Sequence, residues 1–480
     1  MKKQDFNLQF IKSALSLKNK FNDIDQVKEW IKYQNKKVKV DVTKINFSQL
    51  DQWDFSEQTD NLVHRSGKFF SIDGIRVKTI SDVVGEWEQP IINQPEIGYL
   101  GFITKDFDGI LYFLLQAKIE PGNVNYVQLS PTLQATKSNY TQVHKGKTPD
   151  YLDYFTNAKA DQILLDQLQS EQGARFLKKR NRNIIIKIEQ DISLLSNFIW
   201  LTLAQIKLLM CEDNLVSMDT RTVISGIPFG SVDEGAVDFY IETSSFLKKD
   251  SIAVGLLRST LVKDEALHKL DDLINFVTRK KSYFELYVQK IPLFEVRDWV
   301  IEEDCIRHVG NKYFKVIAAK VEIDNREVVS WTQPMIEPAQ EGLCAFVCKN
   351  IDGMLHFAVQ AKLECGNFDI IEFAPTVQCL TGNYRTTGAG HLPFLDYVLN
   401  AKKEQIVFDT IQSEEGGRFY KEQNRNILVL AGDDVDVELP DNYVWMTLNQ
   451  LQTFIKFNNY INIQARSLIA AISFIDYQPK

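Results

Sequence analysis

The chain has 480 residues, which is too long for one ordinary hydrophobic core and predicts two or three domains. Hydrophobic residues make up 44% and charged residues 25% of the sequence, a balance typical of globular rather than disordered proteins. The formal net charge of −8 disfavours broad binding to nucleic acid or to an anionic membrane, although a local positive cluster could still hold a phosphate-bearing small ligand.

Apolar spacing and turn residues indicate helices and strands interspersed along the chain. In chain order we expect a helix over 25–36, strands over 98–105 and 110–118, a helical stretch ending at Phe176, a strand over 184–188 and a helix over 264–280. The first two strands flank Asp106-Phe107-Asp108-Gly109, whose composition favours a tight turn. The pattern predicts a mixed α/β (α+β) fold.

The sequence predicts a cytoplasmic location. No signal-peptide pattern follows Met1, and no uninterrupted apolar stretch reaches the roughly 20 residues that a membrane helix needs. The six cysteines form no CxxC pair and show no His/Cys spacing of a structural zinc site. We therefore expect reduced thiols and no metal site.

The chain repeats itself at a constant offset of 244 residues. Residues 87–140 align with residues 331–384 without a gap, and 22 of these 54 positions are identical. The similarity continues outward with small shifts, so that each copy has the size of a normal domain. We predict an N-terminal repeat with leading helices over 1–225, a connector over 226–262 and a C-terminal repeat over 263–480.

Common catalytic motifs are absent from the sequence. It contains no GxGxxG after a strand, no GxxxxGK[ST], no HExxH and no GxSxG. Rossmann-type dehydrogenases, P-loop enzymes, HExxH zinc proteases and nucleophile-elbow hydrolases are therefore disfavoured.

A first group of polar residues lies at the end of the strand expected over 110–118. Alternation places Gln116, Lys118 and Glu120 on one strand face, and Asn123 follows them. A lysine and a glutamate two residues apart can tune each other's pKa and suit proton transfer at a carbon made acidic by a ketone. A structural ion pair on a solvated sheet face is the competing interpretation.

A second group alternates amides and hydroxyls, as the wall of a sugar-binding or base-binding pocket would. It comprises Gln128, Ser130, Thr132, Gln134, Ser138, Asn139 and Tyr140. Tyr140 is a candidate acid or orienting hydroxyl. The alternative is a polar loop whose side chains cap local backbone groups.

A third group carries five positive charges in the eight residues from Arg175 to Arg182. In an acidic protein this cluster predicts a diphosphate site, because arginine makes bidentate contacts to phosphate. A solvated helix end would give the same pattern. His64 and His308 occupy equivalent places in the two copies and suit either a base or a structural residue.

Seven segments of the chain match one known family in order and in spacing. They are Gln94-Pro-Glu96-Ile-Gly98, Gln116-Ala-Lys-Ile-Glu-Pro-Gly-Asn123, Leu129-Ser-Pro-Thr132, Ser138-Asn-Tyr-Thr141, Leu168-Gln-Ser-Glu171-Gln-Gly173, Phe373-Ala-Pro-Thr-Val-Gln378 and Ser413-Glu-Glu-Gly-Gly-Arg-Phe-Tyr420. The sequence therefore resembles the NDP-hexose 2,3-dehydratases over nearly its whole length.

The resemblance implies two tandem Nudix-like α/β/α sandwich domains, a homodimer, and a nucleotide-sugar pocket in each domain, one catalytic and the other vestigial. It also implies elimination of water across C2 and C3 of dTDP-4-keto-6-deoxyglucose, without a cofactor, to give a 2,6-dideoxy-3,4-diketo sugar nucleotide for deoxysugar biosynthesis. The Nudix metal-binding box does not occur in the sequence. A Nudix-type nucleotide-sugar hydrolase and a non-catalytic nucleotide-sugar-binding protein are the alternatives.

On this interpretation Lys118 or Glu120 is the base, and Tyr140 or His64 assists departure of the hydroxyl or orients the ketone. The residues expected to bind substrate in the first pocket are Gln94, Glu96, Gln116, Asn123, Gln128, Ser130, Thr132, Gln134, Ser138, Asn139, Glu171, Arg175 and Arg182. Those expected in the second pocket are Gln360, Lys362, Glu364, Asn367, Gln378, Asn383, Tyr384, Glu414 and Arg418.

We expect the first copy to be the catalytic one, because its positive cluster is denser and it keeps hydrogen-bonding side chains that the second copy has changed. The changed pairs are Gln128/Glu372, Ser130/Ala374 and Ser138/Gly382.

Overall fold

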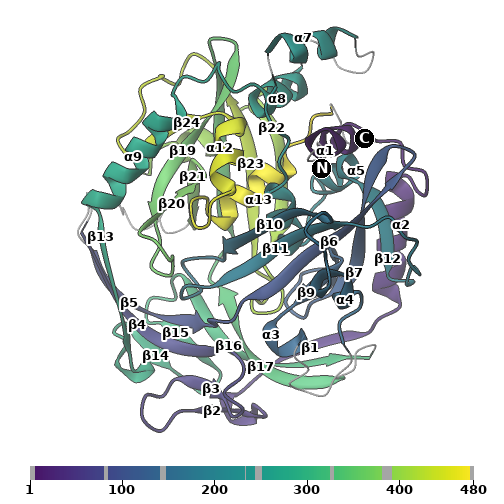
Figure 1. The fold of residues 1–480 in the computed structure, drawn as a ribbon. Coiled ribbons are helices and arrows are strands. Elements are labelled where there is room, and N and C mark those ends of the chain that lie inside the picture. The colour runs from purple at the N-terminus through teal and green to yellow at the C-terminus, as the bar shows by residue number, and fades with distance from the viewer. Residues whose placement is uncertain are drawn as a thin grey trace.

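The computed structural model describes residues 6–80, 85–140, 148–232, 234–243, 251–324, 329–380 and 392–475. Its framework is two seven-stranded sheets and two five-stranded sheets, with helices packed against them (Figure 1). The predicted mixed α/β fold is confirmed.

The large sheet of the first repeat has the strand order β10-β11-β6-β7-β12, with β8 paired to β7 and β9 to β6. Its strands are β6 (Gly98–Phe107), β7 (Ile110–Ile119), β8 (Val127–Pro131), β9 (Leu133–Ala135), β10 (Ile163–Ser170), β11 (Arg180–Lys187) and β12 (Phe198–Thr202). The predicted turn between β6 and β7 is confirmed. Asp108 and Gly109 have positive φ, and the Gly109 N–H donates to Asp106 Oδ1 at 2.8 Å.

The large sheet of the second repeat reproduces these pairings in the order β20-β19-β18-β23-β22, with β21 paired to β18 and β24 to β19. Its strands are β18 (Gly342–Ile351), β19 (Met354–Leu363), β20 (Ile371–Ala374), β21 (Val377–Leu380), β22 (Ile406–Ser413), β23 (Gln423–Ala431) and β24 (Tyr443–Met446). In both sheets one neighbouring pair is parallel, β11 with β6 and β23 with β18. The duplication seen in the sequence is thus a duplication of fold.

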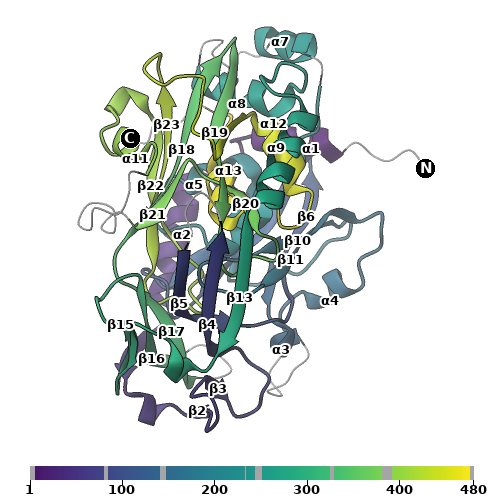
Figure 2. The same cartoon turned by 90° about the vertical axis from the view of Figure 1, so that its left-hand side faces the viewer.

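The two small sheets exchange strands between the repeats. Strand β13 (Glu285–Ile291), at the start of the second repeat, pairs antiparallel with β4 of the first, and Figure 2 shows the two side by side. Strand β1 (Val40–Ile45) pairs in the same way with β16 of the second repeat. The remaining strands are β2 (Trp53–Phe55), β3 (Leu62–His64), β4 (Ser71–Ile80), β5 (Gly85–Asn93), β14 (Trp299–Ile301), β15 (Cys305–His308), β16 (Phe314–Ile323) and β17 (Ser330–Pro338).

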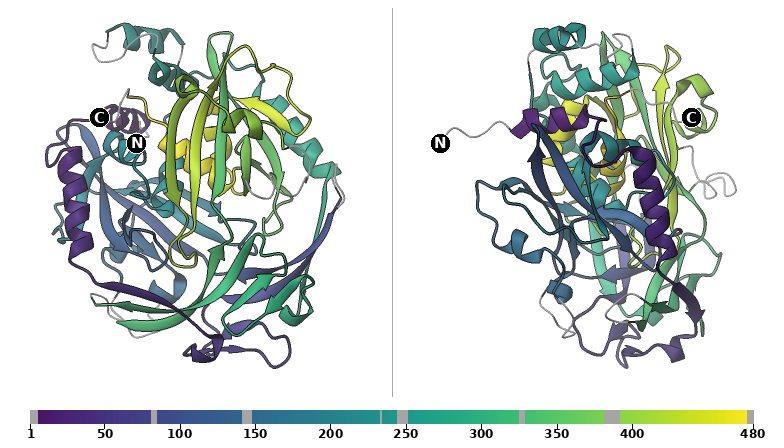
Figure 3. Two further views of the ribbon diagram at one scale, coloured as in Figure 1. Left: turned by 180° about the vertical axis from the view of Figure 1, so that it is seen from behind. Right: turned by 90° about the vertical axis from the view of Figure 1, so that its right-hand side faces the viewer.

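Helix α6 of the first repeat packs against helix α13 of the second, and Figure 3 shows helices of both repeats between the two large sheets. A single apolar core joins Phe102 and Phe113 of the first repeat to Phe346 and Phe357 of the second. The helices are α1 (Phe6–Ala14), α2 (Ile24–Lys36), α3 (Lys137–Tyr140), α4 (Leu152–Thr156), α5 (Leu203–Leu209), α6 (Met218–Ser225), α7 (Glu234–Thr243), α8 (Ile252–Leu261), α9 (Leu270–Tyr283), α11 (Leu395–Leu399), α12 (Leu448–Ile455) and α13 (Ile463–Ala471). Short 3₁₀ turns add η1 (Phe47–Gln49), η2 (Leu293–Glu295) and η3 (Lys403–Gln405).

Helix α8, which lies within the expected connector, occupies the same place in the second repeat as α1 does in the first. The Ser13 hydroxyl donates to the carbonyl oxygen of Leu111 at 2.6 Å, and the Ser259 hydroxyl donates to that of Leu355 at 2.7 Å. The repeated unit therefore extends upstream of the two segments aligned from the sequence.

The helix expected to end at Phe176 is wrong. Residues 163–170 form strand β10, and a turn leads from it to Phe176. Strand β10 pairs antiparallel with β11, and Asp166 on β10 accepts a hydrogen bond from Arg182 on β11. The helix expected over 25–36 is confirmed as α2, which begins with a capping box at Asp23, and the helix expected over 264–280 begins only at residue 270, as α9.

Across the part of the chain that the structure describes, every helix is too short or too polar to span a membrane.

Candidate active site

The first group of predicted residues comes together at the end of β7. Lys118 Nζ lies 3.5 Å from Glu120 Oε1, and the Gln134 amide donates to the same oxygen at 2.7 Å. The Glu120 side chain is 8% exposed. The sequence argument from strand alternation is therefore confirmed in its geometry: the lysine and the glutamate form an almost buried ion pair.

The second repeat completes this pocket. The Gly416 N–H donates to Glu120 Oε2 at 3.1 Å, and the Gly122 N–H donates to the Gly416 carbonyl at 2.7 Å. A Cβ atom at Gly122 would lie 1.7 Å from the carbonyl oxygen of Phe419, so only glycine allows the two loops to meet. The Lys118–Glu120 ion pair of the first repeat is thus held in place by a loop of the second.

The same loop brings Arg418 into the first pocket. The Arg418 guanidinium lies 3.2 Å from Glu415 Oε1 and donates to Gln94 Oε1 at 3.0 Å. The Gln94 amide in turn donates to Glu96 Oε1 at 2.8 Å. Arg418, which the sequence assigned to the second pocket, therefore lies with Gln94 and Glu96 of the first.

Three buried carboxyl groups surround the ion pair. Burial and the charge of Glu415 raise the pKa of Glu171 to about 7, while the charge of Lys179 opposes this shift. Burial also raises the pKa of Glu415, with Glu120 adding to the effect and Arg418 opposing it. Asp219 has its pKa raised well above the ordinary value by burial and then by Glu120 and Glu415. Burial therefore disfavours the ionised forms of these three carboxyl groups.

Lys179 extends the charged cluster beneath these residues. Its Nζ donates to the carbonyl oxygen of Glu96. Burial lowers the pKa of Lys179 to about 8, while Glu171 raises it.

The second pocket has the same framework. The Gln378 amide donates to Glu364 Oε1 at 2.9 Å, and Lys362 Nζ donates to the Gln378 carbonyl at 3.4 Å. Its closing loop comes from the first repeat, because the Gly366 N–H donates to the Gly173 carbonyl at 2.7 Å. Each pocket is therefore built from both repeats.

Arg175 also lies in a different pocket from the one that the sequence predicted, because loops of each repeat close the pocket of the other. Burial raises the pKa of Glu364, and the charge of Arg175 is among those that oppose this shift. Arg175 therefore lies near the second pocket, although the sequence grouped it with the first. Its guanidinium lies 4.3 Å from the centre of the Phe314 ring. The remaining second-pocket residues Gln360, Asn367 and Glu414 are buried or nearly buried, and each has at least one hydrogen-bonding atom near this framework.

Several of the predicted binding residues support the backbone instead. The Gln116 amide donates to the Pro131 carbonyl at 2.8 Å, and Thr132 Oγ1 accepts from the Ile103 N–H at 3.0 Å. Asn123 donates to the Tyr126 carbonyl at 3.2 Å. Of these three residues only Thr132 belongs to the second group, and its contact matches the backbone-capping alternative for that group.

Gln128 and Ser130 are fully buried. The Gln128 amide donates to Ser413 Oγ of the second repeat at 2.7 Å, and in the mirrored contact the Ser170 hydroxyl donates to Glu372 Oε2 at 2.8 Å. The Gln128/Glu372 difference therefore lies in the interface between the repeats.

Tyr140 and Arg182 meet at Tyr99. The Tyr99 and Tyr140 rings are 5.3 Å apart edge to face, and Arg182 donates to the Tyr99 hydroxyl at 2.9 Å. Arg182 also binds Asp166 through two hydrogen bonds, the first cause of its raised pKa. Burial raises the pKa of Tyr140. Arg182 is thus part of an ion pair beside two tyrosines.

His64 lies on β3 in a small sheet. Its ring contacts Trp53 and Phe69, with centroids 5.2 and 4.4 Å away, and its Nδ1 is 2.8 Å from Ser66 Oγ. These aromatic contacts match the structural interpretation of this histidine.

Four predicted residues lie beyond what the structure describes. Asn383 and Tyr384 fall outside the described ranges, and the side chains of Ser138 and Asn139 are not described.

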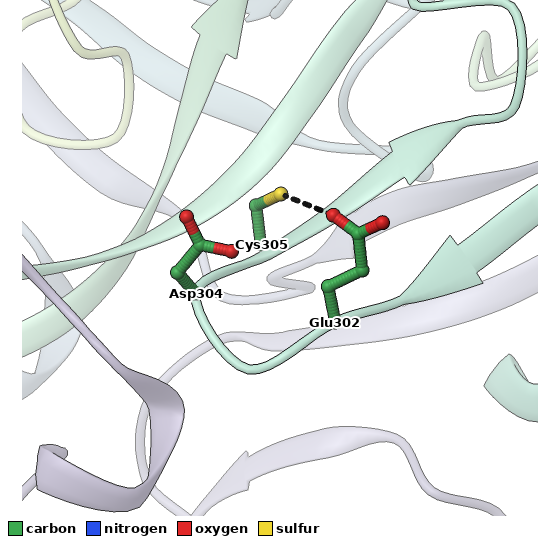
Figure 4. Close-up of side chains that lie close together, drawn as sticks. All are labelled: Glu302, Asp304 and Cys305. Atoms are coloured by element: carbon green, nitrogen blue, oxygen red, sulfur yellow. Dashed lines mark hydrogen bonds between the residues drawn. The ribbon is translucent and has the colours of Figure 1, made fainter.

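Among the described residues, one group of side chains brings potential metal-binding atoms close together: Glu302, Asp304 and Cys305 (Figure 4). Arg307 already donates to Glu302 Oε2 at 3.0 Å. Burial raises the pKa of the Cys305 thiol to about 11, which disfavours the thiolate that a metal needs. This group does not have the chemistry of a metal site.

Sequence reasoning missed Asp219 and Glu415. Their counterparts in the other copy are Gln464 and Gln172. A carboxyl replaced by an amide between two copies that are otherwise alike is a signal that could have found them.

A family model described as NDP-hexose 2,3-dehydratase matches residues 24–227 and 270–472. The chain is 41% identical to the dTDP-4-dehydro-6-deoxy-alpha-D-glucopyranose 2,3-dehydratase of Saccharopolyspora spinosa, over 96% of this chain and 94% of the relative. It is 39% identical to the enzyme of the same name from Amycolatopsis orientalis, over 95% and 91%, and 42% identical to that from Streptomyces violaceoruber, over 90% and 93%. With both repeats matched and the likeness running almost from end to end, the chain belongs to the NDP-hexose 2,3-dehydratase family.

Proposed function

We propose that this protein eliminates water across C2 and C3 of dTDP-4-keto-6-deoxyglucose and releases a 2,6-dideoxy-3,4-diketo sugar nucleotide for deoxysugar biosynthesis. The family and the named relatives support this substrate. The observation that carries the chemistry is the almost buried Lys118–Glu120 pair, closed off by Gly416 of the other repeat.

The C4 ketone acidifies the proton on C3, so a positioned carboxylate suffices to remove it. We assign this step to Glu120. Its two carboxylate oxygens accept hydrogen bonds from Gln134 and from Gly416, which fix the orientation of the carboxylate. Lys118, 3.5 Å from that carboxylate, stabilises the negative charge that develops on the C4 oxygen.

The second half of the reaction removes the C2 hydroxyl as water. The enolate electrons form the C2–C3 double bond, and the resulting enol becomes the C3 ketone as C2 takes up a proton. Gln94, Gln134 and Arg418 lie around the ion pair and are placed to bind the sugar nucleotide.

The first pocket is the working one on this proposal. It adds Asp219 and Glu415 to the lysine and glutamate that both pockets share, where the second pocket has Gln464 and Gln172. An elimination needs both a proton acceptor and a proton donor, and a carboxyl group, unlike an amide, can fill either role.

We further propose that the protein acts in the cytoplasm as a homodimer, as the family resemblance implies. Light scattering coupled to size-exclusion chromatography tests the dimer, and a mass equal to one chain would contradict it.

Incubation with dTDP-4-keto-6-deoxyglucose in deuterated water, with a chelator present, tests the reaction. We expect the product to have lost the mass of one water molecule and to carry solvent deuterium at C2. Recovery of unchanged sugar, or release of free nucleotide, would reject the assignment.

The choice of pocket is tested by a matched pair of variants. We expect Glu120→Gln to lower turnover by about 10²–10⁴-fold, the usual contribution of an acid or base, and Glu364→Gln to retain turnover near that of the wild type. Normal turnover in Glu120→Gln with inactivity in Glu364→Gln would move the active site to the second pocket.

A further inference from the structure

One difference between the two pockets is a pair of facing positions where the repeats meet. In the second pocket the Gln172 amide of the first repeat donates to Glu414 Oε2 of the second. The equivalent positions of the first pocket hold Glu415 and Glu171. An amide beside a carboxylate in one pocket thus corresponds to two carboxyl groups in the other.

Glu171 shows the effect of the missing amide. Asn181 donates to its Oε1, as Asn424 does to Glu414 Oε1 in the other pocket. Glu171 Oε2, however, is a buried atom without a hydrogen-bond partner among the described residues, whereas Glu414 Oε2 has the amide of Gln172. Glu171 therefore keeps an unsatisfied oxygen that its counterpart lacks.

Glu415 is the member of the pair that lies next in sequence to the loop contact with Glu120. Its side chain is 10% exposed, and it precedes Gly416, whose N–H binds the Glu120 carboxylate at 3.1 Å. Its Oε1 accepts from the Gly417 N–H at 3.0 Å and its Oε2 from the Arg418 N–H at 3.1 Å. These donors fix the Glu415 carboxyl beside the base and would stabilise its anion after a proton has left.

Two buried carboxyl groups in one site disfavour each other's ionisation, which favours a proton on one member of the pair. The directions of the shifts agree with this expectation. Burial and the charge of Glu415 together raise the pKa of Glu171 to about 7. Burial raises the pKa of Glu415, with the charge of Arg418 opposing the shift and that of Glu120 adding to it.

We propose that Glu415, contributed by the second repeat, is the catalytic acid of the first pocket and that Glu171 is the positioning residue that keeps a proton on the pair. This assignment rests on the proposed dehydration. It replaces Tyr140 and His64 as donors and gives the second pocket, with Gln172 in that place, no acid.

The proton balance of the step is complete within the two carboxyl groups. Glu120 takes the C3 proton. The C2–O bond then breaks with its electron pair on oxygen, and the Glu415 carboxyl delivers its proton to that oxygen, which leaves as water. On ketonisation the Glu120 proton is released and the enol hydroxyl loses its own. One proton goes to C2, directly or through solvent, and one restores Glu415.

The test separates acid catalysis from every other effect by changing the leaving group. The full-length wild type, Glu415→Gln and the control Glu372→Gln are compared on dTDP-4-keto-6-deoxyglucose and on its 2-deoxy-2-fluoro analogue, because fluoride leaves without being protonated. Glu372 is as buried as the pocket residues, and the first repeat already has Gln128 in its place.

We expect Glu415→Gln to lose about 10²–10⁴-fold in water elimination, as for removal of a general acid, and to release fluoride at a rate close to that of the wild type. It should still exchange the C3 proton with deuterated solvent, because Glu120 remains. Glu372→Gln should match the wild type in all three measurements.

Glu171→Gln tests the positioning role. The charges that face Glu171 are those of Glu415, Lys179, Arg466 and Asp219. Without its like charge beside it, Glu415 loses its proton more readily, so we expect the alkaline limb of the pH profile for water elimination to move to lower pH. An unshifted profile would remove Glu171 from the proposal.

Each result supports or overturns either the acid role of Glu415 or the proposed dehydration. Unimpaired water elimination by Glu415→Gln with an active wild type would overturn the acid role and leave the dehydratase standing. An equal loss of fluoride and water elimination would also overturn it. A wild type that eliminates neither would overturn the proposed function and the acid role with it. If Glu415→Gln does not fold, Glu415→Asp serves, with partial water elimination and full fluoride release expected.

Discussion

The pocket residues show how local charge and burial act together. Glu171, Glu415 and Asp219 all have raised pKa values because burial disfavours their charged forms. The second pocket has amides at two of these three positions, and amides carry no such cost. Carboxyl groups that are held at the expense of folding stability are typical of functional sites.

Asp219 makes this cost measurable. Its folded pKa lies well above the ordinary value, so the folded protein holds a proton that the unfolded chain has already released above about pH 4. The contribution of Asp219 to stability is therefore fully present below about pH 4 and is lost as the pH rises through the folded pKa. We expect the stability of Asp219→Asn relative to the wild type to be greater at pH 8 than at pH 5, growing by roughly 1.4 kcal/mol for each tenfold fall in proton concentration until the pH reaches the folded pKa.

Thermal unfolding at the two pH values checks this expectation. Glu29→Gln, at an exposed position on α2, is the control and should show no such change with pH. A stability difference for Asp219→Asn that is the same at both pH values would contradict a protonated Asp219.

The residues that sequence could predict were those linked by strand alternation. Lys118 and Glu120 are two positions apart on one strand, so the pattern alone places them together. Glu415 lies almost 300 positions further along the chain and reaches Glu120 only because two loops interlock. The local sequence contains no signal for this contact between the two loops. For the same reason the sequence assigned Arg418 to the wrong pocket.

At the level of elements, the turn between β6 and β7 was predictable because Asp106 and Gly109 determine it within four residues. The stretch ending at Phe176 was not, because short runs with both helical and alternating spacing take their structure from their partners. Strand β10 exists because β11 pairs with it.

The interlocking loops give a matched pair of element-level variants. A Cβ atom at Gly122 would lie 1.7 Å from the Phe419 carbonyl oxygen, and one at Gly366 would lie 1.8 Å from that of Phe176. We expect Gly122→Ala and Gly366→Ala to lower the melting temperature by similar amounts, because neither backbone can yield without separating the loops.

Activity distinguishes the two variants, measured per folded molecule below both melting temperatures. Gly122→Ala should lower turnover strongly, because it pushes Gly416 away from Glu120, whereas Gly366→Ala disturbs the other pocket. Equal loss of activity in both would indicate that the pockets depend on each other.

At the level of the whole molecule, the repeats are joined by more than a connector. Each lends a strand to the other's small sheet, and two buried arginines cross between them. Arg221 donates to the Ser413 carbonyl, and Arg466 donates to the Ser170 carbonyl. Together with the common core, these contacts make one folding unit of two repeats.

Expression of residues 1–262 and 263–480 as separate chains tests this unity. We expect each half alone to be insoluble or unfolded by circular dichroism, because β1 and β13 would have no partner and half of the core would face water. Co-expression should recover a soluble complex with activity. A half that is folded and monomeric on its own would show that the exchanged strands are dispensable.

The loop contact between Gly122 and Gly416 also has a consequence for hybrid enzymes made from two relatives. A hybrid enzyme that joins the first half of one relative to the second half of another would take its proton acceptor from one parent and the loop beside it from the other. We expect substrate preference in such hybrids to follow neither parent simply, because each site takes residues from both halves.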